Sequence, residues 1–259
     1  MRPLPRIMVA PNGARLTKQD HPGLPVTIPE IVTAVRDCAA AGADGAHLHV
    51  RDAAQRHVLD AGLYRELLRE LSQVLPGFYV QITTEANGRY TPNEQRALVR
   101  ALRPKAVSIA LREITDQSDE TVTRDFFDEC QAEGISVQHI LYDQTDIAEL
   151  KKLVDQGVVP GDTLKALIVL GRYLDARQTS TPDDLVAPAR ALTTAFPGVD
   201  WAVCAFGAKE TACLVAARDI GGKARIGFEN NLLNSNLTCA TTNAERVRDL
   251  VAHLGPEAA

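Results

Sequence analysis

The sequence predicts an α/β fold in which eight strands and eight helices alternate and close into one (β/α)8 TIM barrel. The length of 259 residues suits a single barrel of this class. Short β-branched runs alternate with amphipathic segments along the whole chain. No Gly/Ser-rich linker or low-complexity tract divides them. We therefore expect a single domain over residues 1–259.

Each expected strand is a short apolar run, and each expected helix carries apolar residues at helical spacing, as at Val247, Leu250 and Leu254. In chain order, strand and helix alternate at 6–10 and 29–41, 45–50 and 63–75, 78–83 and 92–102, 106–111 and 120–133, 136–142 and 145–156, 164–170 and 182–195, 201–206 and 209–220, and 224–229 and 244–254. A doubly wound open sheet is the alternative. It favours a glycine fingerprint after the first strand, where this chain has Pro11-Asn12-Gly13-Ala14-Arg15.

The ends of the expected helices carry local signals. Thr27 and Thr91 each stand three residues before a glutamate, which is the spacing of a capping box. Thr181 is the expected N-cap before a proline in the first turn. Glycine favours the left-handed conformation that ends helices. It follows four of the expected helices, at Gly42, Gly134, Gly157 and Gly221.

Composition and charge exclude several classes of protein. The net charge of −5 predicts no basic face for nucleic acid. No apolar stretch approaches the length of about 18 residues that a membrane span needs. The first residues lack the pattern of a secretory signal, and the five cysteines form no Cys-x-x-Cys pair. We therefore expect free thiols and a cytoplasmic protein.

His47 and His49 are the most informative pair in the chain. Two histidines two positions apart in a strand point to the same side. Glu229 stands at the matching end of the eighth strand, about 10 Å away across the first strand. Two imidazoles and one carboxylate with an open position describe a catalytic zinc site, or a site for another divalent metal. The alternatives are a hydrogen-bonded histidine pair and, for Glu229, a solvated carboxylate or a partner for Arg225.

Other polar residues follow the carboxyl ends of the strands, where barrel active sites lie. The candidate substrate-binding residues are Asn12, Arg15, Thr84, Ser108, Arg112 and Glu113, and the candidate catalytic residues are Thr83, Glu85, Arg225 and Asn230. Arginines 15, 51 and 112 suit a carboxylate, although Arg51 and Asp52 equally suit a local ion pair. Gly171-Arg172 ends the sixth strand. Lys209 suits a phosphate group, but an ordinary surface lysine is favoured.

With these residues in place, the chain resembles the β-keto acid cleavage enzyme family over nearly its whole length. The strings that carry the resemblance are Pro11-Asn12-Gly13-Ala14, Leu24-Pro25-Val26-Thr27, Ala41-Gly42-Ala43, His47-Leu48-His49-Val50-Arg51-Asp52, Gln81-Ile82-Thr83-Thr84, Gly221-Gly222 and Arg225-Ile226-Gly227-Phe228-Glu229. The resemblance implies a (β/α)8 fold, zinc held by His47, His49 and Glu229, and a homo-oligomer, commonly a tetramer. It implies a reaction in which a β-keto acid and acetyl-CoA give acetoacetate and a new acyl-CoA. It also places Arg225 in the active site.

Two residues depart from a well-known member of the family, and Thr83 stands where that member has serine. Asn230 replaces an aspartate credited with removing the substrate proton, and an amide cannot act as that base. Glu85 or Glu113 is the expected replacement. Arg15 replaces a glutamate, which predicts a substrate with an acidic or neutral tail rather than an amine. A lyase or hydrolase without CoA chemistry, and a metal-bound binding protein without turnover, are the alternative functions.

Overall fold

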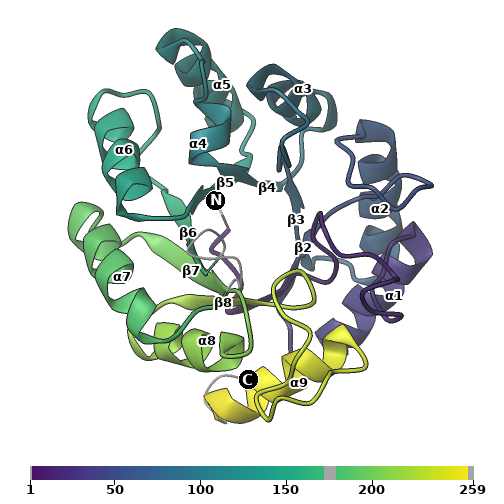
Figure 1. Cartoon of the computed structure of the whole chain (residues 1–259). Coiled ribbons are helices and arrows are strands. Elements are labelled where there is room, and N and C mark those ends of the chain that lie inside the picture. Colours follow the sequence, from purple (N-terminus) through teal and green to yellow (C-terminus); the bar gives the residue numbers. More distant parts are fainter. Residues whose placement is uncertain (1, 172–178, 256–259) are drawn as a thin grey trace.

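The protein forms a closed barrel of eight parallel strands in the order β1 to β8, with β8 paired to β1. The computed structural model describes residues 2–171 and 179–255, so Arg172 lies outside the described residues. Figure 1 views the barrel along its axis, with the helices in an outer ring and α9 beside α1. The prediction of a TIM barrel is confirmed. A single domain over residues 1–259 stays a prediction.

The strands begin and end within a few residues of the predicted positions. They are β1 (Ile7–Val9), β2 (Gly45–Leu48), β3 (Tyr79–Thr83), β4 (Ala106–Ala110), β5 (Ser136–Leu141), β6 (Lys165–Leu170), β7 (Asp200–Ala205) and β8 (Lys223–Ile226). The prediction placed His49 and Glu229 inside strands, which is wrong. Both lie in the turns that directly follow β2 and β8.

The eight predicted helices are all present, and one short helix was not predicted. They are α1 (Ile28–Ala40), α2 (Ala61–Val74), α3 (Pro92–Leu102), α5 (Glu120–Ala132), α6 (Gln144–Asp155), α7 (Asp183–Ala195), α8 (Glu210–Asp219) and α9 (Asn243–Leu254). The additional helix is α4 (Leu111–Ile114), a single turn after β4. Its ends Leu111 and Ile114 are buried.

The capping signals act largely as predicted. The Thr91 hydroxyl accepts from the Glu94 N–H at 3.3 Å, and Glu94 accepts in return from the Thr91 N–H at 2.8 Å. The four glycines predicted to follow helices all have positive φ. Thr181 is an exception, because α7 begins one residue later with Pro182 as its N-cap. The Thr181 hydroxyl instead donates to Asp184 at 3.0 Å.

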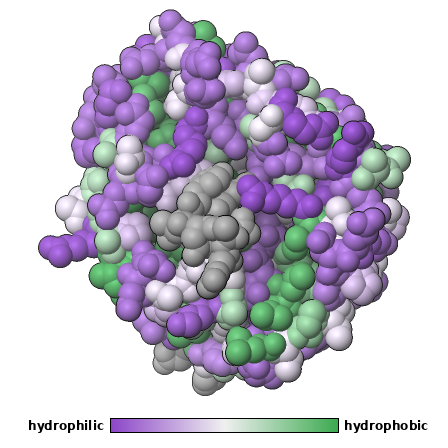
Figure 2. All heavy atoms as spheres, viewed as in Figure 1, coloured by the Kyte–Doolittle hydropathy of each residue, from purple (hydrophilic) through white to green (hydrophobic). Residues whose placement is uncertain are grey.

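The apolar core has an outer and an inner part. The larger cluster lies between strands and helices and includes Val35, Tyr64 and Phe126. A smaller cluster fills the inside of the barrel and includes Met8, Leu167 and Ala202. Buried residues of the helices belong to the larger cluster. Figure 2 shows a mainly hydrophilic surface at the end of the barrel that is seen in Figure 1. Because side chains fill the barrel interior, chemistry is confined to the end where β2, β3 and β8 finish.

Two further expectations concern cysteines and membranes. All five cysteines are free thiols, four of them buried, and only Cys239 is exposed. Within residues 2–171 and 179–255, no helix has the length and apolar character that a bilayer span requires.

His139 on β5 is buried in apolar surroundings between the barrel strands and the helices. Its ring centroid lies 5.3 Å from that of Phe127 on α5. Its Nδ1 has no hydrogen-bond partner among the described residues. Burial lowers the pKa of His139 from 6.5 to about 4. The folded protein therefore binds this proton less readily than the unfolded chain does.

We predict that His139→Phe removes part of the acid sensitivity of the fold. Between pH 6.5 and about pH 4 only the unfolded chain carries this proton, so acidification through that window destabilises the folded state. The expected loss is about 1.4 kcal/mol per pH unit, or about 3 kcal/mol in total. Urea unfolding at about pH 7.5 and about pH 4 measures it. An equal loss in wild type and variant would contradict this assignment.

Candidate metal centre

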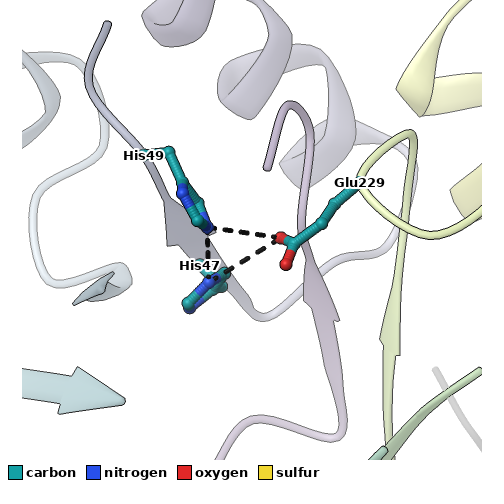
Figure 3. A group of neighbouring side chains, drawn as sticks. All are labelled: His47, His49 and Glu229. Carbon is teal, nitrogen blue, oxygen red and sulfur yellow. Dashed lines mark hydrogen bonds and ion pairs between the residues drawn. The ribbon is translucent and has the colours of Figure 1, made fainter. Parts of the chain in front are cut away.

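Three side chains that the sequence predicts as ligands meet at the carboxyl-terminal end of the barrel strands. His47 Nε2 and His49 Nε2 lie 3.1 Å apart. Glu229 Oε2 lies 3.7 Å from each of these two nitrogens. Figure 3 shows the histidines at the end of β2 and the carboxylate pointing toward them from the turn after β8. Among the described residues, this is the group of three ligand atoms spaced to hold one metal ion.

The proton of His47 is fixed by a row of amides that crosses the barrel. His47 Nδ1 lies 2.9 Å from Gln81 Oε1. Gln81 Nε2 donates to Gln138 Oε1 at 3.0 Å, and Gln138 Nε2 donates to the carbonyl oxygen of Ala166 at 3.1 Å. Because a carbonyl only accepts, each amide in the row is oriented by the next one. His47 therefore carries its proton on Nδ1 and presents a lone pair on Nε2.

The proton of His49 is fixed in the same way by a third histidine. His57 Nε2 lies 2.9 Å from the carbonyl oxygen of Glu85, so this nitrogen donates. In its neutral form His57 then accepts at Nδ1, which lies 3.3 Å from His49 Nδ1. Burial lowers the pKa of His57, which favours that neutral form. His49 consequently also presents a lone pair on Nε2.

Two unprotonated nitrogens therefore face each other in a buried site. A hydrogen bond between them would need a proton that the two outer contacts place on the far side of each ring. Burial holds the pKa of both His47 and His49 well below the usual value, so protonation does not relieve the contact. Two nitrogens on one tetrahedral zinc ion stand about 3.3 Å apart. The donor set thus fits a divalent cation better than the alternative of a hydrogen-bonded histidine pair.

Glu229 is held by the strand and turn that carry it. Its Oε1 accepts from Arg225 Nη2 at 2.9 Å, while Oε2 faces the imidazoles. The Glu229 carboxylate can therefore be a partner of Arg225, the alternative considered from the sequence, and a metal ligand at the same time. Although burial acts to lower the pKa of Arg225, the Glu229 carboxylate raises it, so this arginine stays charged.

The turn between β8 and Glu229 depends on Gly227. Its φ is +147°, and a Cβ there would lie 2.4 Å from the carbonyl oxygen of Ala10. The Gly227 N–H donates to Glu210 at 3.3 Å, and Glu210 pairs with Arg246 at 2.8 Å. Both partners are fully buried, and burial raises the pKa of Glu210 to about 7 despite Arg246. This pair fixes the backbone from which the carboxylate ligand projects.

Two of the three candidate ligands, His47 and Glu229, line a small cavity. Its other polar lining residues are Thr83, Glu85, Tyr142 and Arg225, and all of these except Tyr142 are predicted catalytic residues. Glu85 Oε2 lies 3.8 Å from His49 Nδ1. The Nε and Nη1 atoms of Arg225 are buried and donate no hydrogen bond to any described residue. The cavity thus contains a guanidinium with two donors available to an anion.

Four predicted substrate-binding residues lie behind the cavity wall. Asn12 bonds the backbone of His49, donating to its carbonyl oxygen at 2.9 Å. Thr84 donates to the carbonyl oxygen of Ser108 at 3.3 Å, and Ser108 Oγ lies 3.4 Å from His47 Nδ1. Glu113 accepts from the Ala86 N–H at 2.9 Å. These contacts support the site from outside, and none of the four lines the cavity.

The remaining predicted residues are also outside the cavity lining. Arg15 and Lys209 are exposed. Arg112 is bound to Asp143 and Asp146, each at 2.8 Å. Asn230 is buried, and its side-chain amide forms no hydrogen bond to a described residue. None of these four lines the cavity, and a role for them in the site stays a prediction.

The Arg51–Asp52 ion pair considered from the sequence is absent among the described contacts. Arg51 Nη2 donates to the carbonyl oxygen of Asn12 at 2.8 Å. Asp52 pairs with Arg56 at 2.8 Å instead. Arg51 thus fixes the loop after β1, because its guanidinium reaches across to the backbone rather than to its neighbour. It is not available to form a carboxylate site with Arg15 and Arg112.

Three residues that orient the histidines, Gln81, Gln138 and His57, are not among the predicted site residues. Gln81 pairs in register with His47 on the neighbouring strand. A glutamine in an otherwise apolar strand is a signal for a buried polar contact, and both Gln81 and Gln138 show it. No comparable local signal indicates His57, because it reaches the site through a loop.

These features define the class of protein: a TIM barrel with a candidate His-His-Glu metal centre at the carboxyl ends of its strands. Residues 6–257 match the family of the beta-keto acid cleavage enzyme. The chain belongs to this family of enzymes, which confirms the resemblance seen in the sequence.

Curated relatives are similar over nearly the whole chain. The 3-oxoadipate:acetyl-CoA acetyltransferase of Cupriavidus necator is 25% identical over 95% of this chain and 87% of its own length. The 3-keto-5-aminohexanoate cleavage enzyme of Fusobacterium nucleatum is 26% identical over 98% of this chain and 93% of its own length.

Among solved structures, a binary complex of ObcA with oxaloacetate has a TM-score of 0.71 and 16% identity, and this likeness shows the fold alone. The match covers 88% of this chain but 62% of ObcA, so this chain spans about three fifths of that protein.

We predict that Gln81→Leu lowers the affinity for zinc by about 10- to 100-fold, because His47 Nδ1 loses the acceptor that orients its ring. Gln95→Leu is the matched control. Gln95 is also fully buried, but it donates to the carbonyl oxygen of Thr84. Competition with a chelator measures both affinities. Equal affinities in the two variants would refute the orienting role.

Proposed function

We propose that this protein is a metal-dependent acyltransferase that exchanges acyl groups between a β-keto acid and acetyl-CoA, giving acetoacetate and a new acyl-CoA. The carrying observation is that two unprotonated imidazole nitrogens converge with Glu229, and that Arg225 presents available donors in the cavity that His47 and Glu229 line. Membership of the family and the acetyl-CoA-dependent relative support the same reaction.

In this proposal, His47, His49 and Glu229 hold zinc or another divalent ion. An ion bound there supplies Lewis-acid polarisation of the keto oxygen. Arg225 binds the substrate carboxylate through its Nε and Nη1 atoms, which have no other hydrogen-bond partner among the described residues. Its pairing with Glu229 keeps the guanidinium beside the ligands, so carboxylate and keto group are held at one end of the cavity.

Glu85 is the proposed base that removes the proton from C2 of the substrate. It lines the cavity, whereas Glu113 and Asn230 do not. Glu113 is turned toward the Ala86 N–H and Gln95. Thr83 stabilises the backbone that carries Glu85, because its Oγ1 accepts a hydrogen bond from the Glu85 N–H at 3.0 Å. The Thr83 hydroxyl proton stays available to a substrate oxygen.

The exchange balances without an oxidant or reductant. The bond between C2 and C3 of the β-keto acid breaks, and C2 forms a new bond to the acetyl carbonyl carbon. The acyl fragment that leaves is taken up by the CoA thiol. The proton that the base removes from C2 is returned to the same carbon in acetoacetate, so one base serves both steps.

A lyase or hydrolase on the same barrel without CoA dependence is the second candidate function. Asn230 favours it, because the family member considered above has an aspartate base at this position and an amide cannot replace it. A cytoplasmic location and a homo-oligomeric, tetrameric assembly belong to the main proposal. The location is expected from the cysteines and the first residues, and the assembly from the resemblance to the family.

We predict that Glu229→Gln and His49→Ala lose the bound metal and turnover while the barrel stays folded. Each removes one of three ligands, and an amide is a much weaker ligand than a carboxylate. Elemental analysis and circular dichroism measure the two properties. Glu113→Gln is the control and should keep the ion, because Glu113 lies outside the ligand group. Full metal content in Glu229→Gln would remove that residue from the proposed ligands.

Turnover separates the two candidate functions. The metal-loaded protein is incubated with a panel of β-keto acids, with and without acetyl-CoA. We expect acetoacetate and a new thioester to appear together and only with acetyl-CoA. Cleavage products that form without acetyl-CoA would select the lyase or hydrolase instead.

A further inference from the structure

The cavity beside the metal centre has one polar and one apolar side. The candidate ligands come from β2 and from the turns after β2 and β8, and Glu85 follows β3. The opposite side is formed by residues on and just after β4 to β7, which lie across the closed barrel (Figure 1). The apolar residues of that side are Ala110, Ile140, Val169, Cys204 and Phe206. All five are buried.

The charged lining residues lie together on the polar side. They are Glu85, Arg225 and Glu229. Glu85 Oε2 is 3.8 Å from His49 Nδ1, and Arg225 Nη2 is 2.9 Å from Glu229 Oε1. The apolar side carries one polar group among the described residues, the phenol hydroxyl of Tyr142. A substrate tail directed away from the metal ligands thus meets aliphatic and aromatic surface.

None of the three arginines predicted to suit a substrate carboxylate, Arg15, Arg51 and Arg112, lines the cavity. Arg15 is exposed and lies outside the cavity lining. The Arg112 guanidinium lies 4.7 Å from the centroid of the Tyr142 ring, and Asp143 and Asp146 accept its hydrogen bonds. Tyr142 therefore separates Arg112 from the cavity, and two carboxylates already balance its charge.

These positions restrict the tail of the substrate. With its carboxylate at Arg225, a β-keto acid extends its tail toward Ile140, Val169 and Phe206. Among the described residues, a charged group there would lose its hydration without gaining a partner of opposite charge, which is strongly unfavourable. The cavity is also small, with about 10 Å³ of room for the centre of a water molecule, which favours a short tail.

We propose that the substrates are β-keto acids with a short, neutral aliphatic tail, and that β4 to β7 select them. This inference rests on the function proposed above, and it narrows the acidic or neutral tail expected from Arg15 to a neutral one. It separates this chain from relatives named for an acidic and for an amine-bearing substrate.

Three acids with the same six-carbon chain test the proposal: 3-oxohexanoate, 3-oxoadipate and 3-keto-5-aminohexanoate. Their tails are neutral, anionic and cationic. Calorimetry first measures the binding of each acid to the metal-loaded protein without acetyl-CoA. We expect 3-oxohexanoate to bind at least about 10-fold more tightly than either charged analogue. With acetyl-CoA, we expect a preference in kcat/KM of about 100-fold.

The binding and turnover measurements test the two proposals separately. Binding of 3-oxoadipate or the amino acid as tight as that of 3-oxohexanoate would overturn the inference, as would no binding of any of the three. Selective binding of 3-oxohexanoate without a new thioester would uphold the inference and refute the proposed acyl transfer.

Val169→Lys and Val169→Met form a matched pair for the apolar side. The two new side chains have similar length, but only lysine adds a charge that can meet an anionic tail. We expect Val169→Lys to shift the binding preference toward 3-oxoadipate by at least about 10-fold, while Val169→Met keeps the preference for 3-oxohexanoate. The same shift in both variants would show that size rather than charge decides and would overturn the proposal. Should Val169→Lys not fold, Ile140→Lys and Ile140→Met repeat the comparison.

Discussion

The candidate site depends on the close approach of two imidazole lone pairs. His47 Nε2 and His49 Nε2 lie 3.1 Å apart in a buried place where neither carries a proton. The barrel imposes this contact from the far side of each ring, through Gln81 for one and His57 for the other. Such an arrangement is unfavourable by itself and becomes favourable when a cation lies between the nitrogens and Glu229. Metal binding and the stability of this end of the barrel are therefore linked.

The charges around the cavity also favour a bound divalent cation. Glu85 and Glu229 contribute two negative charges and Arg225 one positive charge, which leaves the cavity with a charge of −1 among its described lining residues. An anionic β-keto acid would be repelled by that field. A divalent ion changes the charge to +1, so one event completes the ligand set and prepares the cavity for an anion. Glu229 contributes both to the ligand set and to the charge of the cavity, because one oxygen faces the imidazoles and the other binds Arg225.

The elements of the fold could be predicted because each carries its own local signal, such as the capping box at Thr91 or the glycine at Gly134. His47, His49 and Glu229 could be predicted because barrel topology brings the ends of β2 and β8 together. The hydrogen-bond network behind them could not, since the row from Gln81 through Gln138 to Ala166 depends on the register of β3, β5 and β6. Arg112 was assigned to substrate because nothing local shows that its charge is balanced by Asp143 and Asp146.

Chemistry and selectivity occupy different strands of this barrel. The groups that can hold a metal, move a proton or bind a carboxylate come from β2, β3 and β8 and the turns after them, whereas the tail of a substrate faces β4 to β7. Residues such as Ile140 and Val169 have the same apolar character as the core, so a sequence alone does not reveal that they line a site. Their replacement changes the surface that meets the tail without altering the ligands or Arg225. A barrel with this division can therefore change its substrate while keeping its metal centre, and relatives named for acidic and amine-bearing substrates are compatible with one shared reaction.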